Sequence, residues 1–123
     1  MIRSATVGDT GAVFRIHAAA VREIAAAHNP PTQIEVWVSR KSADRFHKCI
    51  HDRTVIVDDD AGSVRGFAQL HQKTSTVEAV YVDPGYSRLG IGSRLLAALE
   101  ALARDSGLQL AYAGCVAQFC FIL

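Results

Sequence analysis

The sequence has few cysteines, no excess of charge of one sign and no long membrane-like segment, and each absence excludes a class of protein. Its three cysteines, Cys49, Cys115 and Cys120, are odd in number and lack a C-x-x-C spacing. This argues against a disulfide framework or a cysteine zinc site and predicts a cytoplasmic protein. Thirteen Lys and Arg residues against twelve Asp and Glu give a net charge of +1. A general nucleic-acid binder would carry a larger positive excess, so we expect no nucleic-acid partner.

Neither end of the sequence is typical of a membrane protein. The N-terminus is polar and has no apolar core of a signal peptide. From Ser106 to Leu123 eighteen residues carry no charge, but Gly107, Gln109 and Gln118 interrupt the run. A membrane span needs about 20 predominantly apolar residues. We therefore expect a buried strand followed by an apolar tail, and no membrane partner.

The 123 residues, half of them hydrophobic, suit a single domain with one core. No repeat or low-complexity linker divides them, so we expect one domain over residues 1–123. Hydrophobic periodicity predicts the order β-α-α-β-β-β-α-β, with the second helical region in two pieces. The expected strands are 2–5, 54–57, 64–70, 76–82 and 108–113, and the expected helices are 10–28, 34–38, 42–51 and 91–105.

No metal site is expected. His47 and His51 are four residues apart on a predicted helix, but no acidic residue or cysteine lies at ligand spacing from them. Asp58, Asp59 and Asp60 could bind a cation, although a charged hairpin turn is the simpler interpretation. We therefore interpret both groups as solvated polar surfaces.

The stretch after the fourth expected strand has the pattern of a phosphate-binding loop. Gly90 and Gly92 open the long helix 91–105, whose first N–H groups have no partner within the helix and carry its positive dipole end. Glycines there leave room for a phosphate to approach those N–H groups. Arg88 and Arg94 can add positive charge. A loop that merely starts a helix is the alternative.

Three known phosphate loops can be compared with this stretch. A Walker A loop requires a lysine after its last glycine, and a Rossmann loop requires a third glycine where this chain has Leu95. The third pattern, R/Q-x-x-G-x-G/A, binds the pyrophosphate of coenzyme A. The segment Ser87–Gly92 matches that pattern at both glycines and has serine at its first position.

The strand and turn Val80–Tyr86, together with this loop, resemble the GNAT superfamily of acyl-CoA N-acyltransferases. The resemblance runs from Ile2 to about Leu110. It implies a mixed α/β fold with a mostly antiparallel central sheet flanked by helices. It also implies a C-terminally truncated member, because the last helix and strands of the family, including a helix that bears a tyrosine acid, have no counterpart here.

The resemblance implies an acetyl-CoA-dependent N-acetyltransferase in which a primary amine of a small molecule or protein attacks the thioester directly in a ternary complex. Glu78 is then the candidate base, although a solvated strand glutamate is the other interpretation. A catalytically degenerate acyl-CoA-binding module is the alternative function. The residues implied to bind the cofactor are Val80, Tyr81, Val82, Arg88, Leu89, Gly90, Ile91, Gly92 and Ser93.

The apolar tail predicts self-association. A last strand with an unpaired edge invites pairing with another chain. That edge would lie beside Val116, Phe119 and Phe121, with no charged residue to prevent association. We therefore expect either a homodimer through residues 108–123 or a poorly soluble monomer.

Overall fold

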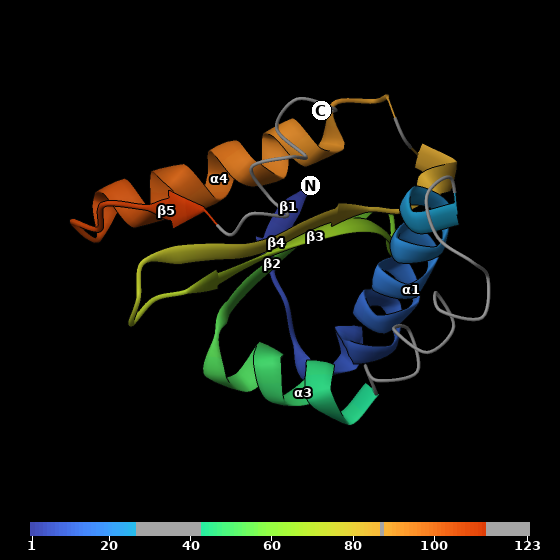
Figure 1. Ribbon diagram of the computed structural model, residues 1–123, viewed down its shortest axis with the longest axis horizontal. Helices are drawn as coiled ribbons and strands as arrows, with labels where there is room; N and C mark the ends of the chain where they lie inside the picture. The colour runs from blue at the N-terminus through green and yellow to red at the C-terminus, as the bar shows by residue number, and fades with distance from the viewer. Residues whose placement is uncertain (27–42, 87, 113–123) are drawn as a thin grey trace.

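The computed structural model describes residues 1–26, 43–86 and 88–112, and its centre is a five-stranded sheet. The strands follow one another across the sheet in chain order (Figure 1). All neighbours are antiparallel except the last pair, which is parallel. The strands are β1 (Ile2–Ser4), β2 (Thr54–Asp60), β3 (Ser63–His71), β4 (Thr76–Val82) and β5 (Ala111–Tyr112). The expected mixed fold with a mostly antiparallel sheet is confirmed.

Helices cover both faces of this sheet (Figure 1). The short 3-10 turn η1 (Val7–Asp9) leads into α1 (Thr10–Ala26), which lies with α3 (Ala43–Asp52) on one face. The other face carries α4 (Ile91–Asp105), which follows the 3-10 turn η2 (Pro84–Tyr86). No helix among the described residues is long and apolar enough to span a membrane.

Two expectations lie outside the described residues. These are the helical piece at 34–38 and the tail after residue 112, on which the predicted homodimer rests. The homodimer therefore stays a prediction.

The second strand is longer than expected. We predicted that it stops at residue 57 and that the acidic residues form the turn, but β2 continues to Asp60 and the turn is confined to residues 61–62. The physical reason is that the acidic side chains have partners within the sheet. Asp58 is 2% exposed and accepts a 2.7 Å hydrogen bond from Arg65 Nε. A buried carboxylate of this kind is tolerated because it is paired.

The last strand begins later than expected. We predicted a strand from Leu108, but among the described residues the pairing with β4 begins at Ala111. The reason is packing, because Leu108 and Leu110 lie partly buried against the apolar cluster under α4. Among the described residues, pairing of β5 with β4 comprises Thr76 with Ala111 and Val77 with Tyr112.

The sheet separates two apolar clusters. The first lies under α4 and includes Leu95 and Leu99, both 0% exposed, packed against Val77 and Val80 of β4. The second lies under α1 and α3, and it includes Val13, Ile16, Phe46, Val57 and Phe67. The three central strands β2, β3 and β4 therefore contribute side chains to both clusters, as a sheet covered on both faces requires.

A glycine in β3 allows α4 to approach the sheet closely. A Cβ added at Gly66 would lie 3.0 Å from Leu95 Cδ1, 3.0 Å from the Tyr81 carbonyl oxygen and 3.2 Å from Ile91 Cγ2. The backbone carbonyl cannot give way as a side chain can. The first turns of α4 therefore depend on the absence of a side chain at position 66.

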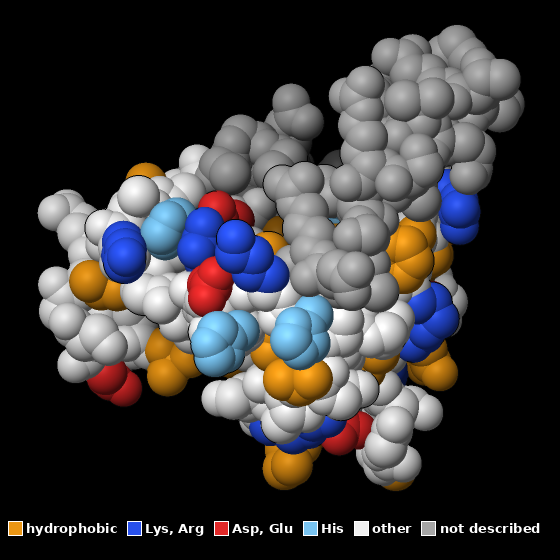
Figure 2. Space-filling model, turned by 90° about the horizontal axis from the view of Figure 1, so that it is seen from below, with side chains coloured by type: hydrophobic (Ala, Val, Ile, Leu, Met, Phe, Trp, Pro, Cys, Tyr) orange, Lys and Arg blue, Asp and Glu red, His pale blue; other side chains and the backbone are white. Residues whose placement is uncertain are grey.

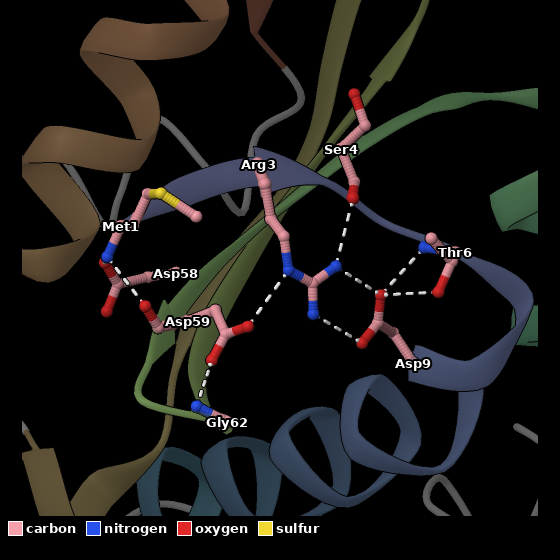
Figure 3. A network of polar contacts seen from close by, with 8 residues as sticks. All are labelled: Met1, Arg3, Ser4, Thr6, Asp9, Asp58, Asp59 and Gly62. Carbon is pink, nitrogen blue, oxygen red and sulfur yellow. Dashed lines mark hydrogen bonds and ion pairs between the residues drawn. The ribbon is translucent and has the colours of Figure 1, made fainter.

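A network of ion pairs connects β1 to the start of α1 and to β2 (Figure 3). Arg3 donates from Nη1 and Nη2 to the two carboxylate oxygens of Asp9, at 2.8 and 3.0 Å, and from Nε to Asp59 at 3.0 Å. The Thr6 N–H also donates to Asp9 at 2.7 Å. The hydrogen bond from Arg3 is the main reason that the pKa of Asp9 falls from 3.8 to about 2.

Acid should remove the contribution of Asp9 to stability. A carboxyl whose pKa is lowered on folding stabilises the protein above its unfolded pKa, near 4, and loses this contribution as the pH falls through 2. We expect Asp9→Asn to lower the free energy of unfolding by about 2 kcal/mol at neutral pH and to flatten its decline between pH 4 and 2. Urea unfolding across this range measures both effects. Asp105→Asn, which changes an exposed residue, is the control, and an equal change there would contradict the assignment.

A methyl group at position 66 should loosen α4. We expect Gly66→Ala to reduce the free energy of unfolding by about 1–3 kcal/mol, because overpacking displaces Leu95 and the first turn of the helix. Chemical denaturation measures the loss. The matched control is Gly11→Ala in α1, where a Cβ meets nothing within 4 Å and a gain of up to about 1 kcal/mol is expected. Equal effects of the two substitutions would show that packing at Gly66 is not tight.

Candidate functional site

The candidate site begins at the exposed edge of β4. On one side β4 pairs with β3 along its whole length, from Thr76 to Val82. On the other side β5 meets only Thr76 and Val77. Within the part of the chain that the structure describes, residues 78–82 therefore have no strand neighbour on this side. Their backbone groups can pair with an extended ligand, as in strand addition.

A β-bulge determines where Glu78 lies. Gln69 is paired with Ala79 and Leu70 with Val77, so Glu78 is an extra residue in β4. Simple alternation would place Glu78 on the face of Val80, which packs under α4. The bulge instead brings Glu78 to the face of α1 and α3, because it shifts the alternation by one residue. Glu78 thus lies on the opposite face of the sheet from α4.

Two side chains on that face hold the Glu78 carboxylate. Oε1 accepts a 3.1 Å hydrogen bond from Arg53 Nε and a 3.0 Å bond from Gln69 Nε2. The Arg53 and Glu78 side chains are 29% and 32% exposed, so solvent reaches both. The result is an oriented carboxylate that remains accessible to a small molecule. Our sequence analysis missed Arg53 and Gln69.

Beyond β4 the chain turns sharply, and Asp83 organises the turn. Its Oδ1 accepts from the Gly85 N–H at 3.0 Å, and its carbonyl oxygen accepts from the Tyr86 N–H at 2.8 Å. Its Oδ2 accepts from Arg15 Nη1 of α1 at 2.8 Å. These bonds fix η2 beside α1, where Figure 1 shows it. The path from β4 to α4 is therefore set by Asp83, through two partners of its carboxylate and one of its main-chain carbonyl.

The N-terminus of α4 offers free backbone donors. Gly90 is the N-cap residue with φ +75°, a left-handed conformation that favours glycine, and no side chain caps the helix. The first intrahelical bond runs from the Arg94 N–H to the Gly90 carbonyl, at 3.1 Å. The N–H groups of residues 91–93 are thus left for an anion. A Cβ at Gly90 would meet no protein atom within 4 Å, so the space above it is open.

The sequence-predicted site residues fall into two groups. Gly90–Ser93 form the start of α4, with Arg88 and Leu89 exposed just before it. Val80, Tyr81 and Val82 form the end of β4, and Tyr81 packs its ring against His17 of α1 at 5.0 Å between centroids. Glu78 is separated from Val82 by four residues, about 13 Å of strand. Ser87 lies outside the described residues.

The described residues show no group of three or more His, Cys, Asp or Glu side chains that could hold a metal ion. The surface over α3 and the neighbouring strand ends instead mixes Lys, Arg and His side chains with acidic ones (Figure 2). On α3 itself His47, Lys48 and His51 are exposed. The chemistry available here is hydrogen bonding and proton transfer by side chains.

Residues 18–118 match the sequence profile described as the acetyltransferase (GNAT) family. The chain belongs to this family. No match was found among curated proteins. The GNAT match covers the candidate site from β4 to α4, and it extends over the second half of α1, α3, β2, β3 and β5.

Solved structures agree with this GNAT assignment. PaiA N-acetyltransferase from Thermoplasma acidophilum, crystallised with coenzyme A, is 20% identical with a TM-score of 0.81, over 88% of this chain and 74% of that one. A GCN5-related N-acetyltransferase from Rhodopseudomonas palustris is 24% identical with a TM-score of 0.81, over 97% and 76%. The yncA protein of Salmonella typhimurium, determined with its cofactor acetyl-CoA, is 28% identical with a TM-score of 0.66, over 88% and 65%.

Proposed function

We propose that the protein is an N-acetyltransferase that transfers an acetyl group from acetyl-CoA to a primary amine. Two neighbouring features carry this proposal. Over residues 78–82 one edge of β4 has no strand neighbour among the described residues, and the N-terminus of α4 has no side-chain cap. Family membership and the relatives determined with coenzyme A and acetyl-CoA support it. Neither relative defines the acceptor of this protein.

The two features suit the two ends of acetyl-CoA. The N–H groups of residues 91–93 bind the pyrophosphate, and the exposed side chains of Arg88 and Arg94 add positive charge beside it. The main chain of Val80–Val82 pairs with the pantetheine arm as an added strand. An arm that starts at α4 and follows the β4 edge backwards runs toward Glu78. Its thioester end therefore comes near the bulge.

The chemistry at that end requires a proton acceptor and a hydrogen-bond donor. A primary amine is protonated at neutral pH, with a reference pKa near 10.4 for lysine, so its proton must leave before attack. We assign this role to Glu78, directly or through a water molecule, because Arg53 and Gln69 hold its carboxylate in one orientation. A backbone N–H at the β4 edge beside the thioester stabilises the negative charge that develops on the thioester oxygen. The amine attacks directly in a ternary complex.

Substitution of Gly90 should abolish tight binding of coenzyme A. Valine disfavours the left-handed φ of +75°, and its side chain would enter the open space above the helix N-terminus. We expect Gly90→Val to raise the dissociation constant of coenzyme A at least about tenfold, through the loss of charge-assisted hydrogen bonds to the pyrophosphate. Isothermal titration calorimetry measures this. Gly107→Val, at a glycine of similar φ (+73°) after α4, is the control. Unchanged affinity in the Gly90 variant would place the cofactor elsewhere.

Removal of the charge of Glu78 should reduce turnover without reducing cofactor affinity. We expect Glu78→Gln to lower kcat by about 10²- to 10⁴-fold, because the amide cannot accept the proton as a general base does. Glutamine keeps the shape of the side chain and the acceptor oxygen for Arg53 and Gln69, so the surroundings should stay the same. A thiol-release assay with acetyl-CoA and a panel of amines gives kcat. The control is Glu100→Gln, the same substitution at a residue of α4 that accepts a hydrogen bond from the Tyr112 hydroxyl.

The outcome of that assay separates the possible functions. Unchanged turnover in Glu78→Gln would assign the proton to water rather than to Glu78. No turnover in the parent protein, combined with coenzyme A binding, would support the alternative of a catalytically inactive acyl-CoA-binding module.

A further inference from the structure

Arg53 has unused binding capacity on the face of α1 and α3. Arg53 donates only from Nε, and among the residues that the structure describes its terminal nitrogens make no hydrogen bond or ion pair. The residue is fixed at its backbone, where its N–H donates to the Cys49 carbonyl of α3 at 2.8 Å. Five N–H donors in a rigid fork are suited to bind a carboxylate with two parallel bonds. Here one side of the fork is occupied by Glu78 and the other is available.

A second side-chain nitrogen without a hydrogen-bond partner among the described residues lies beside Arg53. Register places His71 of β3 next to Arg53, because Thr54 is paired with Leu70. The Nδ1 atom of His71 is buried and has no hydrogen-bond partner among the described residues. Figure 2 shows Lys, Arg and His side chains on this side of the molecule, mixed with acidic ones.

Partial burial strengthens the electrostatic interactions that both side chains can make with a ligand. The Arg53 and Glu78 side chains are about two thirds buried, at 29% and 32% exposed, so their interaction with a bound ion is less screened than on an open surface. A ligand with two positive charges would meet Glu78 favourably but Arg53 unfavourably. A ligand with one positive and one negative group close together would satisfy both.

We propose that Arg53 and Glu78 together form a subsite for an acceptor that carries a carboxylate next to its amine, as an α-amino acid does. Glu78 faces the amine, and the terminal N–H groups of Arg53 hold the carboxylate. This inference rests on the proposed acetyltransferase function and adds the class of acceptor to it. Arg53 is then a specificity-determining residue as well as a positioning residue for Glu78.

The test compares acceptors that differ in the group beside the amine. Leucine, leucinamide and isopentylamine share one side chain and carry a carboxylate, a neutral amide and no substituent, respectively. For the full chain we expect kcat/KM for leucine to exceed that for leucinamide by at least about tenfold, the effect of hydrogen bonds to a charged group. In Arg53→Gln this ratio should fall to about one, and in Arg53→Lys, which keeps the charge without the fork, it should fall to an intermediate value.

The ratio distinguishes recognition from a purely structural role. If Arg53 only orients Glu78, Arg53→Gln lowers kcat/KM for all three amines equally and leaves the ratio unchanged, which would overturn the inference. Lys73→Gln removes a cation outside the contacts of Glu78 and should keep the parent ratio. Thermal unfolding of each variant verifies folding.

Failure of this inference and failure of the proposed function give different results. Turnover of the amines without preference for the carboxylate would overturn the acceptor class alone. No turnover of any amine by the parent protein would overturn the proposed function and, with it, this inference.

Discussion

The packing of α4 on the sheet is the constraint on which the site depends. Ile91, Leu95 and Leu99 recur at helical spacing and are at most 1% exposed, in contact with the apolar side chains of β3 and β4. Because a helix is rigid, these contacts along three turns also fix where its N-terminus lies. Gly66 determines how closely the first two turns approach the strands. The free donors of α4 are therefore set at one distance from the end of β4.

The segments with strong local signals were predictable from the sequence. The strand over Thr76–Val82 and the helix over Ile91–Asp105 have the predicted bounds, because β-branched residues end at Asp83 and an apolar stripe starts after Gly90. The Gly90 N-cap has the positive φ that makes a glycine useful there. The family resemblance was carried by this same stretch, in which local sequence determines local geometry.

Features that depend on pairing between distant segments were not predictable. The bulge at Glu78 arises from the register of β3 with β4, and nothing in the local pattern marks an extra residue. The three acidic residues at the end of β2 predict a turn from the sequence alone. The structure shows that they continue the strand, because Arg65 pairs with Asp58. Gln69 could have been found, because a simple hairpin register places it opposite Glu78. Arg53 could not, because its contact crosses twenty-five residues of sequence.

The two parts of the candidate site are distributed differently along the sequence. The residues assigned to acetyl-CoA form one short stretch, 80–93, whereas the groups around Glu78 come from three separate strands or their ends. A substitution at position 53 or 69 therefore changes the surroundings of the acceptor without altering the donor segment. Evolution can retune the choice of amine by single exchanges while the donor half is inherited intact. The fold thus places the proposed donor segment and the proposed acceptor groups on separate parts of the sequence, so that either can change without the other.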